Sequence, residues 1–251
     1  MIWSDSHATL ELIARGIGLI AIVHGFEFLY LRARIEAIWR WSDLESELGS
    51  VLRFPLSAIG FQVLNVIRIA SGVMAVFYPN GICLVVLLVI HVLTLLRWLG
   101  TFNGGSDYMY LLLLWSCALG LTFPAELGRL VLYYVSFQLC LSYVKAGWVK
   151  ITKREWRSGE ALGHFLMSPQ YMRTRWVESF ANSKWLVFLA AWVVMLFELS
   201  FPLGLGHAGI AILYMVCGCV FHLINAYVFG LNRFFLTWVV AYPALYFTCT
   251  S

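Results

Sequence analysis

Residues 143–160, YVKAGWVKITKREWRSGE, combine a lysine at the end of a long apolar run with several further cations and aromatic rings. Lys150 stands near the predicted boundary of that run. A lysine in such a place can extend its amine to the water at a membrane surface. If it is instead partly removed from water, the charged form is disfavoured and the neutral amine can act as a base. Lys150 is therefore a candidate catalytic base, and the residues alone are compatible with either role.

Ionisable residues also stand inside other strongly apolar runs. A charge in the hydrocarbon region of a membrane is costly in free energy, so such residues usually face the interior of a helix bundle, pair with one another or take part in chemistry. Each of them is therefore a candidate site residue. The set is His24, Glu27, Arg68, His91, Glu198 and His222.

His24 and Glu27 are three residues apart, so they share one face of a helix. They form either a local hydrogen-bonded pair that fixes helix packing, or part of a metal site or proton relay. They are the candidate metal ligands, although no metal is predicted. Arg68 is expected to pair with Glu27 or Glu198, or to hold a quinone oxygen or a substrate carboxylate.

Haem binding and metal binding by the histidines are two further alternatives. His91 and His222 could hold a haem between helices. No two histidines within one helix have the spacing of a familiar di-haem cytochrome, so haem is not expected. Histidines and glutamates could also build a metal site, yet nothing in the sequence shows that they converge. The simplest interpretation of His91 is a hydrogen-bonded interior histidine. The six cysteines lack a zinc-binding spacing, and we interpret them as small apolar core residues.

The elements that carry these residues follow from composition and run length. Of 251 residues, 61% are hydrophobic and only 12% are charged, against roughly 45–50% and 25% in an ordinary soluble domain. A helix needs about 20 apolar residues to cross a bilayer, and the runs reach that length repeatedly. The sequence predicts an all-α, multi-pass transmembrane bundle of about eight helices in one domain, 1–251. The expected spans are 11–33, 61–78, 81–99, 108–124, 128–149, 184–204, 208–230 and 234–250.

Two polar stretches separate the apolar runs, at about 35–50 and 154–183. Both are rich in tryptophan and in charged residues, which predicts amphipathic segments in the membrane interface. The lipid bilayer is thus the first expected partner, and the net charge of +4 gives no reason to expect nucleic acid. We expect an integral, multi-pass protein of a bacterial cytoplasmic membrane.

Part of the sequence resembles a known family, the HTTM family, whose membrane domain is shared with vitamin K-dependent gamma-glutamyl carboxylase. Family members show a lysine after Ala-Gly, then a polar turn and Trp-x-x-Gly. FELSFPLGL (197–205) and FHLINAYVFGLNRFFLTWVVAY (221–242) are similar to the glutamate- and histidine-containing helices of the family. GLIAIVHGFEF near the N-terminus also resembles DoxX-like membrane proteins. The matching residues of the first motif are Tyr143, Ala146, Gly147, Lys150, Trp156, Ser158 and Gly159.

The resemblance implies a role for Lys150. In the carboxylase, the lysine after Ala-Gly deprotonates reduced vitamin K, and oxygen then drives epoxidation and carboxylation. Lys150 stands at that position, so the resemblance implies a base that acts on a quinol. The neighbouring position, often a second lysine in the carboxylase, is Val149 here, and the chain lacks the large soluble domain that binds the protein substrate. Bacterial members of the SdpB type, which mature a secreted peptide with a small partner, resemble this chain more closely.

The expected function is thus that of a membrane enzyme, or a subunit of one, which modifies or matures a peptide or protein with a quinol as cofactor. Lys150 would be the base, with His222 and Glu198 as the other candidate catalytic residues. The alternative is a non-catalytic subunit that anchors or stabilises a larger membrane complex, so a protein partner is expected in both cases. The candidate cofactor-binding residues are Arg68, His91, Trp148 and Trp156.

Two arguments disagree on the orientation of the chain in the membrane. Basic residues concentrate on the side that carries residues 145–184, and the positive-inside rule assigns that side to the cytoplasm. In the carboxylase, by contrast, the active face lies outside the cytoplasm. The sequence leaves the orientation open.

Overall fold

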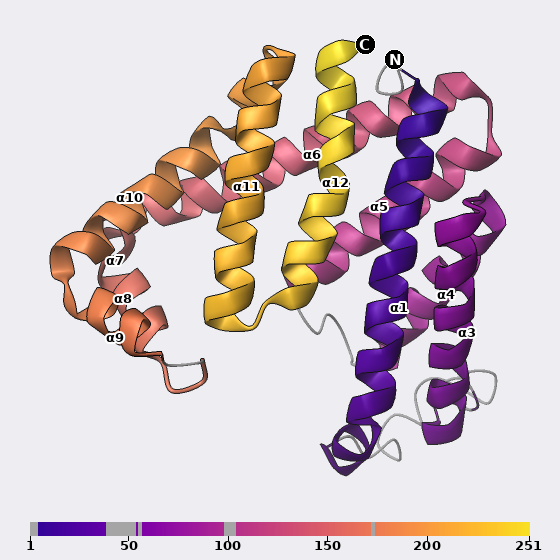
Figure 1. The fold of residues 1–251 in the computed structure, drawn as a ribbon, viewed down its shortest axis with the longest axis horizontal. Coiled ribbons are helices and arrows are strands. Elements are labelled where there is room, and N and C mark those ends of the chain that lie inside the picture. Colours follow the sequence, from indigo (N-terminus) through magenta and orange to yellow (C-terminus); the bar gives the residue numbers. More distant parts are fainter. Residues whose placement is uncertain (1–4, 39–53, 55–56, 98–103, 172–173) are drawn as a thin grey trace. The chain divides into compact units, whose positions relative to one another are not determined.

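The computed structural model describes residues 5–38, 54, 57–97, 104–171 and 174–251, with side chains of the first helix described up to Leu31. Over these residues the regular secondary structure is helical and contains no strand (Figure 1). The predicted all-α helix bundle is confirmed. Of the amphipathic segment predicted at 35–50, residues 35–38 continue the first helix, and the remainder lies outside the described residues.

The chain forms two compact units, 1–131 and 132–251. In the first unit, α1 and α3 lie side by side because two glycines let their backbones approach. A Cβ atom at Gly72 would lie 2.8 Å from the carbonyl oxygen of Gly18. The unit also contains the first turns of α6. Its other helices are α1 (Ser6–Ile38), α3 (Ala58–Phe77), α4 (Gly81–Arg97) and α5 (Gly104–Thr122).

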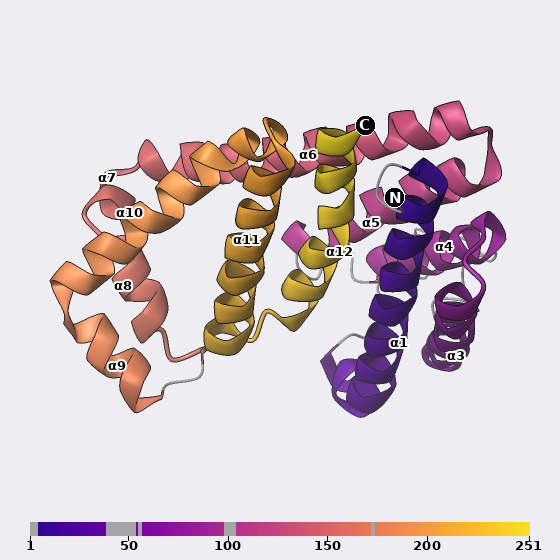
Figure 2. The same ribbon diagram turned by 45° about the horizontal axis from the view of Figure 1, so that its top comes forward.

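The second unit contains the stretch with the candidate base. The long helices α6 and α10 cross each other, and three short helices form the connection between them (Figure 2). Helices α11 and α12 form an adjacent hairpin. The bounds are α6 (Ala125–Ile151), α7 (Arg154–Arg157), α8 (Glu160–Met167), α9 (Arg175–Asn182), α10 (Lys184–Ser200), η3 (Phe201–Leu205), α11 (Ala208–Phe229) and α12 (Asn232–Thr250). Whether residues 1–251 are one domain, as expected from the sequence, stays a prediction.

Five helical segments among the described residues are long and apolar enough to cross a membrane. Their outward faces carry large apolar side chains such as Leu213 and Val216, which lipid chains solvate better than water does. The prediction of an integral membrane protein is confirmed, while the number of about eight crossings stays a prediction. The segments are Ser6–Leu31, Ala58–Phe77, Ala125–Ile151, Lys184–Leu205 and Ala208–Phe229, and a shorter apolar helix is Gly81–Arg97.

The basic stretch after α6 ends that helix and fixes the next one. Arg157 donates a hydrogen bond from Nη1 to the carbonyl oxygen of Ile151 over 2.7 Å, which satisfies a free carbonyl at a helix end that also favours positive charge. The indole nitrogen of Trp192 in α10 donates to the carbonyl oxygen of Arg157 over 3.1 Å. Helix α7 is therefore held between the end of α6 and the side of α10.

Gly159 lies between α7 and α8 and is the glycine of the Trp-x-x-Gly motif. Its φ of 80° lies in the left-handed region, which glycine adopts without steric cost. A Cβ atom there would also lie 2.9 Å from the Cα atom of Phe188. Both the backbone conformation and the close approach to α10 therefore require glycine.

We expect Gly159→Ala to destabilise the protein more than Gly230→Ala, by about 1–3 kcal/mol for the added steric overlap. Gly230 is the matched control, because its φ is 69° but nothing lies within 4 Å of the position of a Cβ atom. Each alanine should carry the left-handed penalty of roughly 1–2 kcal/mol. Unfolding by SDS in mixed micelles measures the stability of both variants. Equal losses would contradict the role assigned to the Phe188 contact.

Candidate functional site

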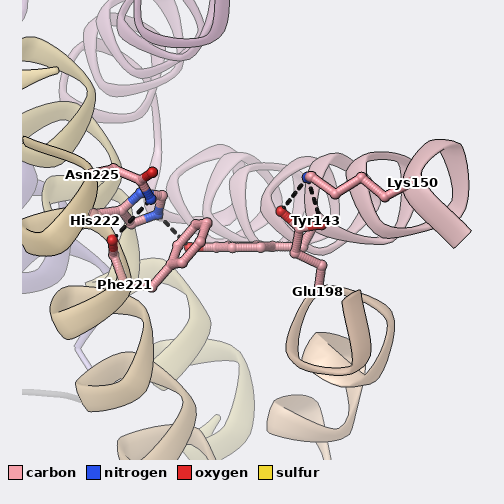
Figure 3. Close-up of polar contacts among 6 residues, drawn as sticks. All are labelled: Tyr143, Lys150, Glu198, Phe221, His222 and Asn225. Carbon is pink, nitrogen blue, oxygen red and sulfur yellow. Dashed lines mark hydrogen bonds and ion pairs between the residues drawn. The ribbon is translucent and has the colours of Figure 1, made fainter. Parts of the chain in front are cut away.

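The ammonium group of Lys150 contacts both carboxylate oxygens of Glu198, at 2.6 Å and 2.7 Å (Figure 3). Lys150 lies in the last turn of α6 and Glu198 near the end of α10. The side chains are 19% and 4% exposed, so the pair is largely enclosed. Charge-assisted hydrogen bonds of this length are strong where water is excluded, and the candidate base is therefore paired with the second candidate catalytic residue.

A glycine one turn before Lys150 allows this pairing. A Cβ atom at Gly147 would lie 2.9 Å from Cγ of Leu199 and 3.0 Å from both the backbone nitrogen of Leu199 and Cβ of Glu198. Small residues at such crossings let two membrane helices approach closely. Gly147 of the motif thus lets the backbone of α6 lie against α10, and the ion pair forms beside that contact.

An aromatic ring from the connection covers the amine. The ring of Trp156 in α7 lies 5.4 Å from Nζ of Lys150, within the range of a cation–π interaction. Trp156 also packs against Phe165 of α8, with ring centroids 6.0 Å apart. Trp148 is instead 63% exposed on α6. Of the two tryptophans predicted to bind a cofactor, Trp156 therefore lies at the site.

A second polar group lies two turns earlier on α6. The hydroxyl of Tyr143 is 2.6 Å from Nε2 of His222 and 2.7 Å from the hydroxyl of Tyr242 (Figure 3 shows the first contact). The absence of a side chain at Gly218 makes room for this chain, because a Cβ atom there would overlap the Tyr242 hydroxyl. The three polar side chains come from α6, α11 and α12, so one hydrogen-bonded chain joins three helices.

Aromatic rings surround this chain. The ring of Tyr143 stacks on that of Phe201 with centroids 3.8 Å apart. The imidazole of His222 lies 4.9 Å from Phe234, 5.0 Å from Phe221 and 5.4 Å from Trp238, measured between ring centroids. The polar atoms of Tyr143 and His222 are therefore enclosed by apolar surfaces, where hydrogen bonds between them are stronger than in water.

The remaining predicted site residues lie in the first unit. Arg68 donates hydrogen bonds to the hydroxyl of Thr94 and, over 3.4 Å, to the carbonyl oxygen of Ile90. Nε2 of His91 is 3.1 Å from the carbonyl oxygen of Asp107, which agrees with a hydrogen-bonded interior histidine. Pairing of Arg68 with a carboxylate stays a prediction.

Two histidines of the first unit flank one tyrosine. The rings of His24 and His91 lie 5.4 Å and 4.9 Å from that of Tyr110. Glu27 is half-buried on the same helix as His24. In the part of the chain that the structure describes, no three His, Cys, Asp or Glu side chains gather as a metal site.

Three residues of the second unit were missed as site residues by sequence reasoning: Tyr143, Tyr242 and Trp238. A signal existed for Tyr143, because it precedes Lys150 by seven residues and so lies on the same helix face. No comparable signal exists for Tyr242 or Trp238. They are ordinary aromatic residues of an apolar run, and only the packing of α12 against α6 and α11 makes them neighbours of His222.

A family profile described as the HTTM domain matches residues 124–250. The chain belongs to the HTTM family. The suspected family assignment is confirmed, and with it a membrane protein of a carboxylase-related family. A search among curated proteins and a search among solved structures each gave no match.

The matched part of this HTTM protein runs from the start of α6 to the end of α12. It contains Lys150, Glu198 and His222 together with the glycines that bring their helices into contact. The motif residues of the HTTM resemblance thus have separate structural tasks. Gly147 sets a helix crossing, Trp156 covers the amine and Gly159 closes the connection.

We expect Gly147→Ala to lower the stability of the HTTM protein by about 1–3 kcal/mol, because its methyl group forces α6 away from α10. Gly163→Ala is the matched control. At that position the nearest atom to a Cβ is Cγ1 of Val187 at an ordinary 3.7 Å, so the better helix propensity of alanine should leave stability unchanged or slightly raised. Thermal unfolding in mild detergent measures both variants, and equal behaviour would refute the crossing described here.

We expect Glu198→Gln to destabilise the protein by about 3 kcal/mol, because it leaves an enclosed ammonium without its counter-charge. The double variant Lys150→Met with Glu198→Leu should recover most of this loss, since it removes both charges. Lys145→Met, at an exposed position of the same helix, is the control and should change stability by less than about 0.5 kcal/mol. SDS-induced unfolding of the wild type and the three variants measures each loss of stability, and a loss for Glu198→Gln no larger than that for Lys145→Met would mean that the pair does not hold the helices.

Proposed function

We propose that this HTTM protein is a membrane enzyme, or the catalytic membrane subunit of one, in which Lys150 removes a proton from a lipophilic acidic hydroxyl. The observation that carries the proposal is the contact of its amine with both oxygens of Glu198 in an enclosed place. A catalytic base needs a partner that can take its resting proton and a site from which bulk water is kept out. Glu198 and the surrounding rings supply both.

The proton path can be written from these two side chains. The Lys150 ammonium passes one proton to the Glu198 carboxylate, which leaves a neutral amine beside a carboxylic acid. The amine then accepts the proton of the substrate hydroxyl and becomes an ammonium again, next to the substrate anion. Its charge stabilises that anion. No oxidant is needed for this step, and Glu198 later releases its proton.

A quinol suits this step for two reasons. It is an acidic hydroxyl on a flat, apolar ring, and the ring of Trp156, 5.4 Å from Nζ, offers a flat aromatic surface beside the amine. It is also soluble in the bilayer that the helices cross. The family resemblance favours the same substrate class. The proposal extends to a small protein partner and to a bacterial cytoplasmic membrane, as in members of the SdpB type. Cofactor binding by Arg68, His91 and Trp148 stays a prediction.

The test uses the full chain in detergent, without a partner. Organic extraction followed by mass spectrometry should recover near-stoichiometric quinone from the wild type. Reduced 1,4-naphthoquinone added without oxygen at pH 7 should show the red-shifted absorption of its anion when bound. Lys150→Arg should abolish that absorption, because a guanidinium keeps the charge beside Glu198 but does not act as a base.

Lys145→Arg is the matched control and should keep the anion signal, since that lysine is exposed. If naphthoquinol binds to the wild type but stays neutral, the proposed role of Lys150 as the base is wrong. If extraction recovers only bulk phospholipid and naphthoquinol does not bind, the proposal of a quinol substrate is wrong.

A further inference from the structure

Two buried nitrogen atoms in the second unit have no hydrogen-bond partner among the described residues: Nδ1 of His222 and Nε1 of Trp238. The side chains are only 1% and 7% exposed, and their rings are neighbours, with centroids 5.4 Å apart. A buried donor without an acceptor is costly and uncommon in folded proteins. Two such donors on neighbouring rings indicate a position prepared for an acceptor.

The hydrogen-bonded chain behind His222 allows two arrangements of its protons. Tyr143 has one hydroxyl proton and two partners, Nε2 of His222 and the hydroxyl of Tyr242. If Tyr143 donates to Nε2, Tyr242 donates to Tyr143, and a neutral His222 carries its proton on Nδ1. In the reverse arrangement the Tyr242 proton has no described acceptor. An acceptor at Nδ1 therefore selects the first arrangement, in which every proton of the chain has a partner.

The surroundings select the chemistry of the acceptor. The rings that contact His222 are those of Phe221, Phe234, Tyr143, Trp238 and Tyr242, and none of them carries a charge. An anion would lose its hydration there without gaining a counter-charge. A neutral oxygen on an apolar molecule is weakly hydrated, so its transfer to this place costs little hydration free energy. Phe221 and Phe234 are half-buried, and their rings place aromatic surface next to the imidazole of His222.

We propose that Nδ1 of His222 and Nε1 of Trp238 bind the carbonyl oxygen of a neutral, apolar molecule, with Tyr143 and Tyr242 as positioning residues that hold the imidazole tautomer. The site goes beyond the proposed function, because it needs neither Lys150 nor removal of a proton. Two molecules in a membrane supply such an oxygen: a quinone-type ring and the ester of a phospholipid chain.

The test is infrared difference spectroscopy of the purified full chain in nanodiscs with carbon-13 in one type of carbonyl at a time. One sample receives carbonyl-labelled duroquinone, and the other contains phospholipid labelled in its ester carbonyls. We expect a bound carbonyl band at lower wavenumber than the free one, with either the quinone or the lipid label, and the label that shifts identifies the source. Trp238→Phe and His222→Phe should each return the band part of the way, because each removes one of the two donors.

Two matched controls distinguish a binding role from a packing role. Trp185→Phe changes an exposed indole, and Tyr214→Phe changes a ring of the same aromatic cluster that takes no part in the chain. Both should keep the shifted band. Lys150→Arg should also keep it, whether or not Lys150 acts as the base. Tyr143→Phe should weaken the shift. If duroquinone is the ligand, Trp238→Phe should weaken its binding roughly 2- to 13-fold, the effect of one neutral hydrogen bond.

Three outcomes overturn the proposal. Neither label shifts in the wild type, which would leave only buried water at the two nitrogens. The band shifts, but Trp238→Phe and His222→Phe leave it in place. The band moves equally in the Trp185→Phe control. Because His222→Phe can disturb the fold, thermal unfolding is recorded for every variant, and Trp238→Phe decides the result if His222→Phe does not fold.

Discussion

The contact between Lys150 and Glu198 fixes where α6 and α10 meet in the second unit. Two opposite charges, on residues 48 positions apart in the sequence, meet at 2.6 Å where little water reaches them. Taking either charge out of water alone is costly, so each is tolerated only while the other is present. The pair therefore requires α6 and α10 to cross at one place, and the crossing requires glycine at 147. The short helices between them then fit around that crossing.

Helix α6 also carries the second polar contact, through Tyr143. Its hydroxyl contacts His222 of α11 and Tyr242 of α12, and its ring stacks on Phe201 of η3, directly after α10. In a bilayer the hydrophobic effect does not favour one helix pairing over another, so close packing and hydrogen bonds determine which helices meet. The two polar contacts of α6 thus provide much of the specificity with which this unit assembles, and both lie where chemistry or ligand binding is expected.

The helical elements could be read from the sequence because their signal is local. An apolar run must satisfy its own backbone in lipid, which leaves the helix as the only solution for a run of this length. The predicted run 128–149 lies within α6 (Ala125–Ile151), and 208–230 coincides with α11 (Ala208–Phe229) to within one residue. The short helices α7 to α9 were expected only as an amphipathic stretch. Their geometry depends on contacts with α10, such as that of Gly159 with Phe188.

By itself, the sequence determined a helical membrane protein and its HTTM family, and it singled out Lys150 as the candidate base, because run length, composition and the motif around that lysine are properties of contiguous residues. Only the tertiary structure decided the partners. On charge alone Glu198 could have paired with Arg68, and nothing in the sequence connects His222 to Tyr143 or Trp238. Those contacts depend on which faces of distant helices pack together, and in a membrane that choice is made by small residues and buried hydrogen bonds spread over the whole chain.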